Sequence, residues 1–168
     1  KNKKIVDYFT NHNLPKIYTS DLIRTVETAK PTAEIHKSEI VKIPALKEIS
    51  FGEWEGLTYD EIKAKWPKDI EIFFKKPAAV KISGGESFSE VQNRAWEAFK
   101  EIVQEYDDES DIFIVSHGGT VRTILCAVMN LDLNEMWKIS IDNGGISCIL
   151  QLENRCWIKN INDTNFLK

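Results

Sequence analysis

The stretch Ile112-Phe113-Ile114-Val115-Ser116-His117-Gly118-Gly119-Thr120 decides the fold of this chain. Its four apolar residues in a row are typical of a strand buried on both faces, as the central strands of a parallel sheet are. The two glycines then permit a tight turn into a helix predicted from Thr120 to Met129. A helix N-terminus presents unpaired N–H groups and favours an anion, so His117 is well placed to bind phosphate. A structural histidine beside a glycine turn is the alternative interpretation.

Around this stretch, short apolar strands alternate with amphipathic helices. We predict strands at residues 16–19 and 40–43, and helices at residues 21–35 and 59–66, the second of which a proline ends. Pro31 is expected to kink the first helix or to begin a second piece. The longest helix follows a capping box formed by Ser87 and Glu90. Strands separated by helices predict an α/β domain with a mainly parallel sheet covered on both faces.

The end of the chain predicts a different arrangement. Residues 146–152 and 157–161 are β-prone runs joined by a short polar segment at 153–155, which indicates a closing hairpin. At the other end, Ile5, Val6 and Phe9 have helical spacing, so the chain is expected to open within a helix.

Composition excludes several classes of protein. The chain has 168 residues, 42% hydrophobic and 29% charged, which is typical of one globular domain. The longest apolar run, residues 124–129, is far shorter than the roughly 20 residues that a membrane span needs. A net charge of −4 gives no advantage in binding a polyanion, so nucleic acid is not an expected partner. Three irregularly spaced cysteines predict free thiols and a cytoplasmic location.

Polar residues follow two of the predicted strands where ligands of an α/β sheet collect. Ser20 and His117 both come after a strand and before a helix, at the carboxyl ends of the strands. Arg24 lies in the first helical turn after Ser20, and its planar fork matches phosphate oxygens. A cation at the start of a helix is disfavoured by the helix dipole, which favours a functional role for Arg24. A solvated Arg24 paired with Asp21 or Glu27 is the alternative.

Three acids lie in a loop that follows the second strand. They are Glu48, Glu53 and Glu55, and their neighbours include Ile49, Phe51 and Trp54. A carboxyl group held among apolar side chains keeps its proton more readily, as a general acid needs to. The segment alone does not say which acid is functional.

Four motifs occur in one order along nearly the whole chain. They are Ser20-x-x-x-Arg24-x-x-Glu27-Thr28-Ala29, Glu48-x-x-x-Gly52-x-Trp54-Glu55-Gly56, Gly84-Gly85-Glu86-Ser87 and Ser116-His117-Gly118-Gly119. In order and spacing they resemble the histidine phosphatase family, also called phosphoglycerate mutase-like. The resemblance implies a three-layer α/β/α sandwich with a mainly parallel sheet, and a single domain over residues 1–168.

The resemblance also implies a chemistry, which is phosphoryl transfer through a phosphohistidine. Carried over to this sequence, Arg24 and His117 hold the phosphoryl oxygens, Gly118 offers its backbone N–H, and Glu48 protonates the leaving oxygen. Arginine and histidine supply the positive charge, so no metal or other cofactor is expected. The three histidines also lack metal-ligand spacing.

One family motif has no counterpart here. The attacking histidine of the family lies in Arg-His-Gly at the end of the first strand, whereas His12 is followed by Asn13 and His36 by Lys37. We therefore expect that the first strand and the nucleophile loop are missing, and that this domain is N-terminally incomplete. The 168 residues alone are then expected to be inactive.

The segment from Gly56 to Gly84 is short, which favours the phosphatase branch that includes α-ribazole phosphatases. The expected function is a phosphomonoesterase acting on a small phosphorylated metabolite, with α-ribazole 5′-phosphate as a candidate and a homodimer as a further expectation. The alternatives are a phosphoglycerate mutase-type phosphotransferase and a non-catalytic phosphate-binding module. A hydrolase using Ser116 or Cys126 with His117 is a weaker alternative, because adjacent side chains on a strand point to opposite faces.

Overall fold

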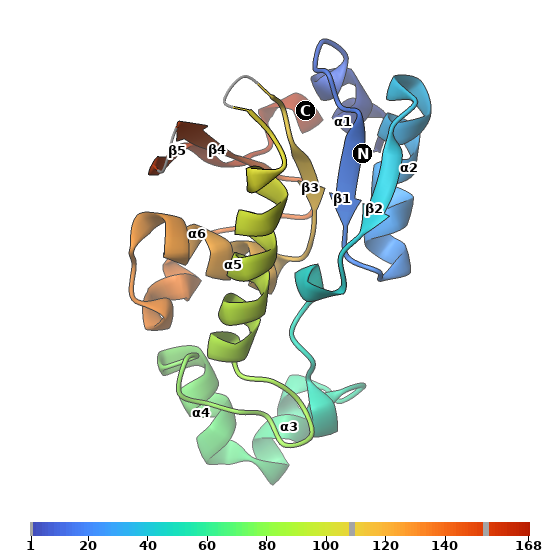
Figure 1. The fold of residues 1–168 in the computed structure, drawn as a ribbon. Coiled ribbons are helices and arrows are strands. Elements are labelled where there is room, and N and C mark those ends of the chain that lie inside the picture. Colours follow the sequence, from blue (N-terminus) through green and yellow to red (C-terminus); the bar gives the residue numbers. More distant parts are fainter. Residues whose placement is uncertain (1, 108–109, 153–154) are drawn as a thin grey trace.

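The computed structural model describes residues 2–107, 110–152 and 155–168 of the chain. The main sheet has three parallel strands in the order β2-β1-β3 (Figure 1). They are β1 (Lys16–Thr19), β2 (Glu39–Lys42) and β3 (Phe113–Val115). A second, antiparallel sheet contains β4 (Ile146–Leu152) and β5 (Arg155–Asp163). Both predicted strand segments of the closing hairpin are confirmed, while residues 153–154 of its predicted connection lie outside the described residues.

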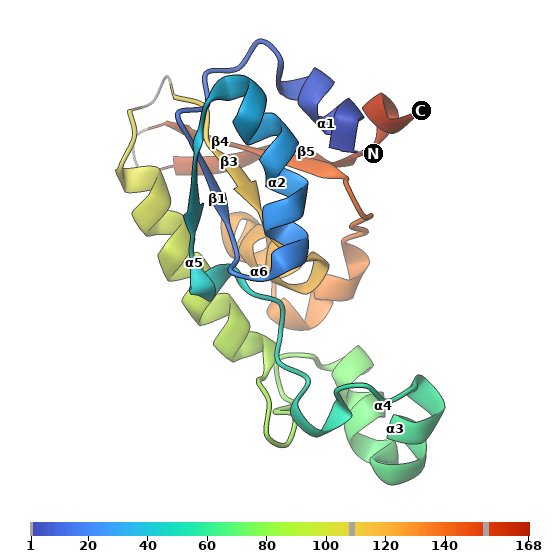
Figure 2. The ribbon, with the colours of Figure 1, turned by 90° about the vertical axis from the view of Figure 1, so that its right-hand side faces the viewer.

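Helices cover both faces of the main sheet (Figures 1 and 2). On one face α1 (Asn2–Phe9) and α2 (Ile23–His36) pack against Ile17, and on the other α5 (Phe88–Gln104) and α6 (Gly118–Met129) pack against Tyr18. These neighbouring residues of β1 point to opposite faces because side chains alternate along a strand. The three-layer α/β/α architecture is therefore confirmed.

The position of β3 differs from the prediction. Its apolar run predicts a central strand, yet among the described residues β3 pairs with β1 alone and lies at the edge of the sheet. The apolar run arises because helices cover both faces of the strand. Val115 is buried on the side of α1 and α2, and Ile114 packs on the side of α5. Covered faces and paired edges are separate properties, and the apolar pattern records only the first.

Pro31 does not begin a second helix, which was one of the two predicted outcomes, because α2 is continuous from Ile23 to His36. Proline has no N–H, so the carbonyl of Glu27, four residues earlier, loses its usual helical partner. The side-chain amide of Asn2 donates to that carbonyl at 3.3 Å. A group on α1 thus satisfies the carbonyl that the proline leaves without a partner in α2. The helix also begins two residues later than predicted.

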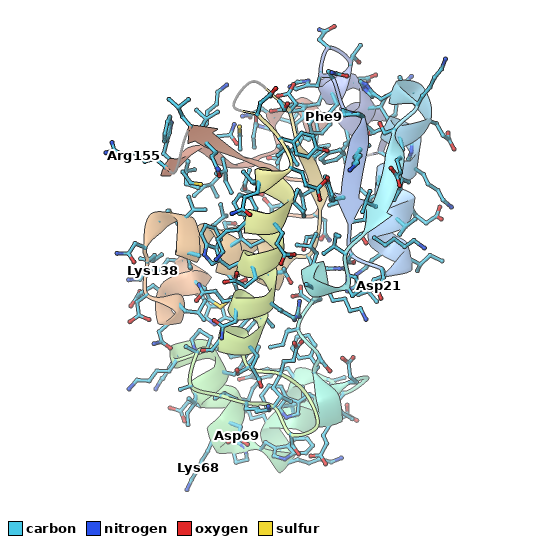
Figure 3. The ribbon with its side chains drawn as sticks, viewed as in Figure 1. Phe9, Asp21, Lys68, Asp69, Lys138 and Arg155 are labelled. Carbon is cyan, nitrogen blue, oxygen red and sulfur yellow. The ribbon has the colours of Figure 1, made fainter. Side chains whose placement is uncertain are left out.

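A helical lobe lies beyond the carboxyl ends of β1 and β2 (Figure 2). It contains α3 (Tyr59–Lys65) and α4 (Pro67–Lys75), whose exposed tip carries Lys68 and Asp69 (Figure 3). The predicted capping boxes before α3 and α5 are both present. Trp54 and Phe73 form the centre of the lobe and join it to the N-terminal end of α5 through Phe88.

Short 3-10 turns complete the fold. They are η1 (Pro44–Leu46), η2 (Gly52–Trp54), η3 (Leu133–Lys138) and η4 (Asn165–Leu167). Throughout the described ranges, no helix combines the length and the apolar character that crossing a membrane requires.

Candidate active site

The candidate site lies at the carboxyl ends of the three parallel strands. β1 leads into Ser20, β2 leads through η1 to Glu48, and β3 leads into His117. Backbone hydrogen bonds continue the sheet just past the strand ends, from Ile43 N to Thr19 O at 2.7 Å and from Ser20 N to Val115 O at 3.3 Å. All three loops therefore leave one edge of the sheet, the lower edge in Figure 1, where an α/β fold collects ligands.

His117 is the buried centre of this site, with 7% of its surface exposed. Its Nδ1 accepts a hydrogen bond from Arg24 Nε at 3.1 Å, and its Nε2 lies 2.8 Å from Ser20 Oγ. Because Nδ1 accepts, the neutral ring carries its proton on Nε2 and donates to Ser20. Burial, and then the charge of Arg24, lower the pKa of His117 to about 4, although the Glu48 carboxylate acts in the opposite direction.

Arg24 is the second residue of α2 and is exposed to solvent. The alternative partners considered for it are engaged elsewhere, because Asp21 pairs with Lys47 at 3.0 Å and Glu27 pairs with Lys30. Figure 3 labels Asp21 at this same edge of the sheet. Arg24 instead donates to His117, so the guanidinium and the imidazole form one cationic corner that an anion can reach from solvent.

Glu48 is the one acid of the predicted three that enters the site. Its Oε2 accepts from Gly119 N at 3.0 Å and its Oε1 accepts from Ile49 N at 3.0 Å. The carboxylate therefore lies at the N-terminus of α6, next to the cationic corner. Glu53 and Glu55 are exposed in and beside η2, on the lobe. The structure thus brings Arg24, Glu48 and His117 to the same end of the sheet.

The two glycines after His117 have different surroundings. Gly118 is the first residue of α6, and a Cβ there would lie 3.1 Å from Arg122 Nη1, the end of a flexible side chain. A Cβ on Gly119 would lie 2.4 Å from Glu48 Oε1 and 3.0 Å from Phe88 Cε1. Gly118 is the glycine expected to offer its N–H to substrate, whereas Gly119 makes the observed hydrogen bond to Glu48. Glycine at position 119 is required because the carboxylate occupies the space of a side chain.

The sequence placed Ser20 and Ser116 at the strand ends without giving them a role, and it did not indicate Thr120. Ser20 bonds His117, and the hydroxyls of Ser116 and Thr120 donate to the carbonyls of Leu46 and Lys47, at 2.8 and 2.6 Å. Their position after a strand end could have signalled them. Arg94 also contacts the Glu48 loop, but it lies in the middle of α5 and no local pattern distinguishes it.

The structure argues against a serine or cysteine nucleophile. Ser116 donates its hydroxyl to Leu46 O rather than to a base. Cys126 is fully buried, and burial followed by the nearby charge of Asp132 raises the pKa of its thiol to about 11. Across the described parts of the chain, no group of three or more His, Cys, Asp or Glu side chains is arranged to hold a metal ion.

A guanidinium beside a buried imidazole, at the carboxyl ends of parallel strands, can bind a phosphoryl group, and the neighbouring carboxylate can move a proton. The family model of the histidine phosphatase superfamily (branch 1) matches residues 2–164. The chain belongs to this superfamily and is that of a phosphohydrolase enzyme with the phosphoglycerate mutase-like fold.

Three similar proteins illustrate this membership. "Phosphoserine phosphatase 1" of Hydrogenobacter thermophilus is 33% identical over 162 residues, which is 96% of this chain and 76% of that protein. The structure of Bacillus stearothermophilus YhfR has a TM-score of 0.93 at 27% identity, covering 99% of this chain and 83% of that one. The α-ribazole phosphatase of Shigella flexneri has a TM-score of 0.84 at 21% identity, covering 96% and 80%, and shows likeness of fold.

Proposed function

We propose that the protein containing this chain is a metal-independent phosphomonoesterase that acts on a small phosphorylated metabolite through a phosphohistidine intermediate. The observation that carries the proposal is the hydrogen bond from Arg24 to His117 beside the Glu48 carboxylate. A phosphoryl dianion needs fixed positive charge and hydrogen-bond donors, and this corner offers both.

Arg24 and His117 bind the transferring group. The guanidinium presents N–H groups in one plane, which suits two phosphoryl oxygens. A bound dianion favours protonation of His117, which the free site keeps neutral. The imidazole and the backbone N–H of Gly118 then complete the set of donors. Substrate binding is therefore expected to take up a proton.

Glu48 acts on the ester oxygen. Each carboxylate oxygen already accepts one backbone N–H, and each keeps a second lone pair that can carry a proton or accept one from water. As a nitrogen of the attacking histidine bonds to phosphorus and the bond from phosphorus to the ester oxygen breaks, Glu48 gives that oxygen a proton. Water then attacks the phosphorus and gives a proton to Glu48, the bond from phosphorus to the histidine nitrogen breaks, and inorganic phosphate leaves.

The attacking histidine comes from outside the 168 residues. His12 lies before the start of β1 and His36 lies shortly before the start of β2, so both are at the amino ends of the strands, away from the site. Of the three histidines, His117 alone contacts Arg24. A nucleophile delivered beside these two residues by another segment of the protein completes the proposed site.

O-Phosphoserine is the first substrate to test, because a relative named phosphoserine phosphatase is 33% identical over 96% of this chain. α-Ribazole 5′-phosphate stays a second candidate, since its named phosphatase shares the fold at 21% identity. Both are small phosphate monoesters, and we place the enzyme that hydrolyses them in the cytoplasm, acting as a monomer or a homodimer.

The test uses the full-length protein with excess chelator. We expect release of inorganic phosphate from one of the two substrates, and capture of an acid-labile, base-stable phosphoenzyme after rapid quenching. Turnover that stops on chelation would contradict the proposal. Phosphate binding with no turnover of any ester would favour the non-catalytic module, and formation of an isomeric phosphate ester would favour the mutase alternative.

A further inference from the structure

Arg94 uses every N–H of its guanidinium around the segment that carries Glu48. Its Nη1 donates to the carbonyls of Ala45 and Lys47 at 2.6 and 2.9 Å. Its Nη2 donates to the carbonyl of Glu48 at 3.2 Å and to Glu86 at 2.9 Å, and its Nε donates to Glu86 at 2.8 Å. Five donors therefore meet five acceptors, which is the full capacity of an arginine side chain.

Glu86 holds the same segment from its other end. Ser50 N donates to Glu86 Oε2 at 2.9 Å, and Glu86 N donates to Ser50 O at 3.0 Å. Burial raises the pKa of Glu86, but the hydrogen bonds from Arg94 and from the Ser50 backbone outweigh it, so the pKa lies below its usual value. The carboxylate thus stays charged and keeps both of its contacts.

These contacts lie on both sides of the proposed acid. Arg94 binds carbonyls from residue 45 to residue 48, and Glu86 binds residue 50, so the backbone of Glu48 is fixed before and after its Cα. Its side chain contacts α6 through Gly119. Arg94, on α5, and Glu86, in the turn before α5, therefore determine how far the Glu48 carboxylate reaches toward His117.

A purely stabilising role does not account for this arrangement. The side chains of Arg94 and Glu86 are only 23% and 26% exposed, and removing two charges from water offsets most of their attraction. The bonds are also concentrated on one short loop rather than spread over the core. We infer that Arg94 and Glu86 are positioning residues that aim the Glu48 carboxyl group at the ester oxygen. This inference rests on the proposed role of Glu48.

The test compares kcat/KM of the full-length protein for two esters. p-Nitrophenyl phosphate has a leaving group that departs without a proton, whereas an alkyl phosphate such as O-phosphoserine needs the acid. Arg94→Lys keeps the charge but cannot form the five-bond fork. We expect it to lower kcat/KM for the alkyl ester about 10²-fold, the scale of a 1 Å misplacement, and for the nitrophenyl ester only several-fold.

Two further variants sharpen the result. Glu86→Gln keeps an acceptor for Ser50 N but removes the ion pair, and should show the same selective loss to a smaller extent. Lys100→Met breaks the exposed Lys100–Glu97 pair on the same helix and should leave both rates unchanged. Combined with Glu48→Gln, Arg94→Lys should add almost no further loss on the alkyl ester, because both changes remove one function.

Each outcome separates the two proposals. Equal losses on both esters in Arg94→Lys and Glu86→Gln, in proportion to lowered thermal stability, would show a structural role and overturn the inference. If Glu48→Gln is selective for alkyl esters and the Arg94 and Glu86 variants are not, the inference alone fails. If Glu48→Gln is itself not selective, the proposed acid is wrong, and the inference fails with it.

Discussion

On one side of the candidate site His117 is held by side chains, and on the other side Glu48 is held by backbone groups. The first group, which we name the phosphate half, contains Ser20, Arg24 and His117, and its members bond one another. The second, the acid half, places the Glu48 carboxylate on the N–H groups of Ile49 and Gly119. Side chains that bond one another can give up those bonds and bind a ligand instead. A carboxylate bound to the main chain keeps its position. The contrast suits a site that must bind an anion and also present a fixed proton donor.

Glu48→Gln, in the acid half, is expected to cause the largest loss of activity. The amide keeps the size of the side chain but cannot give up a proton, so kcat/KM for an alkyl phosphate should fall about 10³-fold, within the range of general acid catalysis. The loss for p-nitrophenyl phosphate should be much smaller. Steady-state assays of the two esters check this, and equal losses would contradict the assignment.

The phosphate half is tested by Arg24→Ala. Removing the guanidinium takes charge stabilisation from the transferring group, so kcat/KM should fall about 10²- to 10³-fold for both esters. Lys30→Ala, which removes an exposed cation from the same helix, is the matched control and should retain full activity. A loss of kcat/KM for the alkyl ester alone in Arg24→Ala would contradict the assignment of charge stabilisation to the phosphate half and proton donation to the acid half.

The pH dependence of stability isolates His117. Its pKa is about 4 in the folded protein and about 6.5 when unfolded, so between these values the unfolded chain binds a proton that the folded one does not. Stability should therefore fall as the pH drops from about 7 to 4, by at most about 3 kcal/mol from this group.

Urea denaturation at several pH values measures this loss, and the same series on His117→Asn gives the control. The difference in slope between the two proteins should lie between pH 4 and 6.5 and should shrink when inorganic phosphate is present, since the anion stabilises the charged ring. Identical profiles for both proteins would show that His117 titrates normally.

The smallest expected effect comes from Gly119→Ala. A Cβ at this position would lie 2.4 Å from Glu48 Oε1, so the carboxylate must move by up to about 1 Å and kcat/KM for the alkyl ester should fall at most about 10²-fold. Affinity for inorganic phosphate, measured by calorimetry, should be unchanged because the phosphate half is not contacted. A drop in that affinity would mean that the two halves move together.

The sequence predicted the elements of the fold well where a local cause operates. The strands 16–19 and 146–152 and the capping boxes at Thr58 and Ser87 follow from alternation and from side chains that bond the backbone a few residues away. The predicted helix break at Pro31 was wrong because its consequence depends on Asn2, which donates to the carbonyl of Glu27 from another helix. The prediction that β3 is a central strand was wrong because an apolar run does not indicate which strands pair.

The site was predictable to a similar degree. Arg24, Glu48 and His117 each follow a strand, and parallel strands bring such residues to one edge. Arg94 was not predictable, because it lies mid-helix and reaches the site only through the packing of α5 on the Glu48 loop. The role of Gly119 likewise depends on a carboxylate that is distant in sequence.

The two ends of the helical lobe lie against each other. Gly52, with a positive φ, packs directly on the turn that contains Gly84 and Gly85, and a Cβ on Gly52 would lie 2.2 Å from Ser83 O. The two ends of the segment between Gly52 and Gly84 are therefore held together by direct backbone packing. Residues 57–72 can therefore change in length and sequence without altering this packing. Phe73, by contrast, packs on Phe88, and Ile82 N donates to Glu86 O at 3.3 Å, so changes at these two positions reach the residues that hold the proton donor.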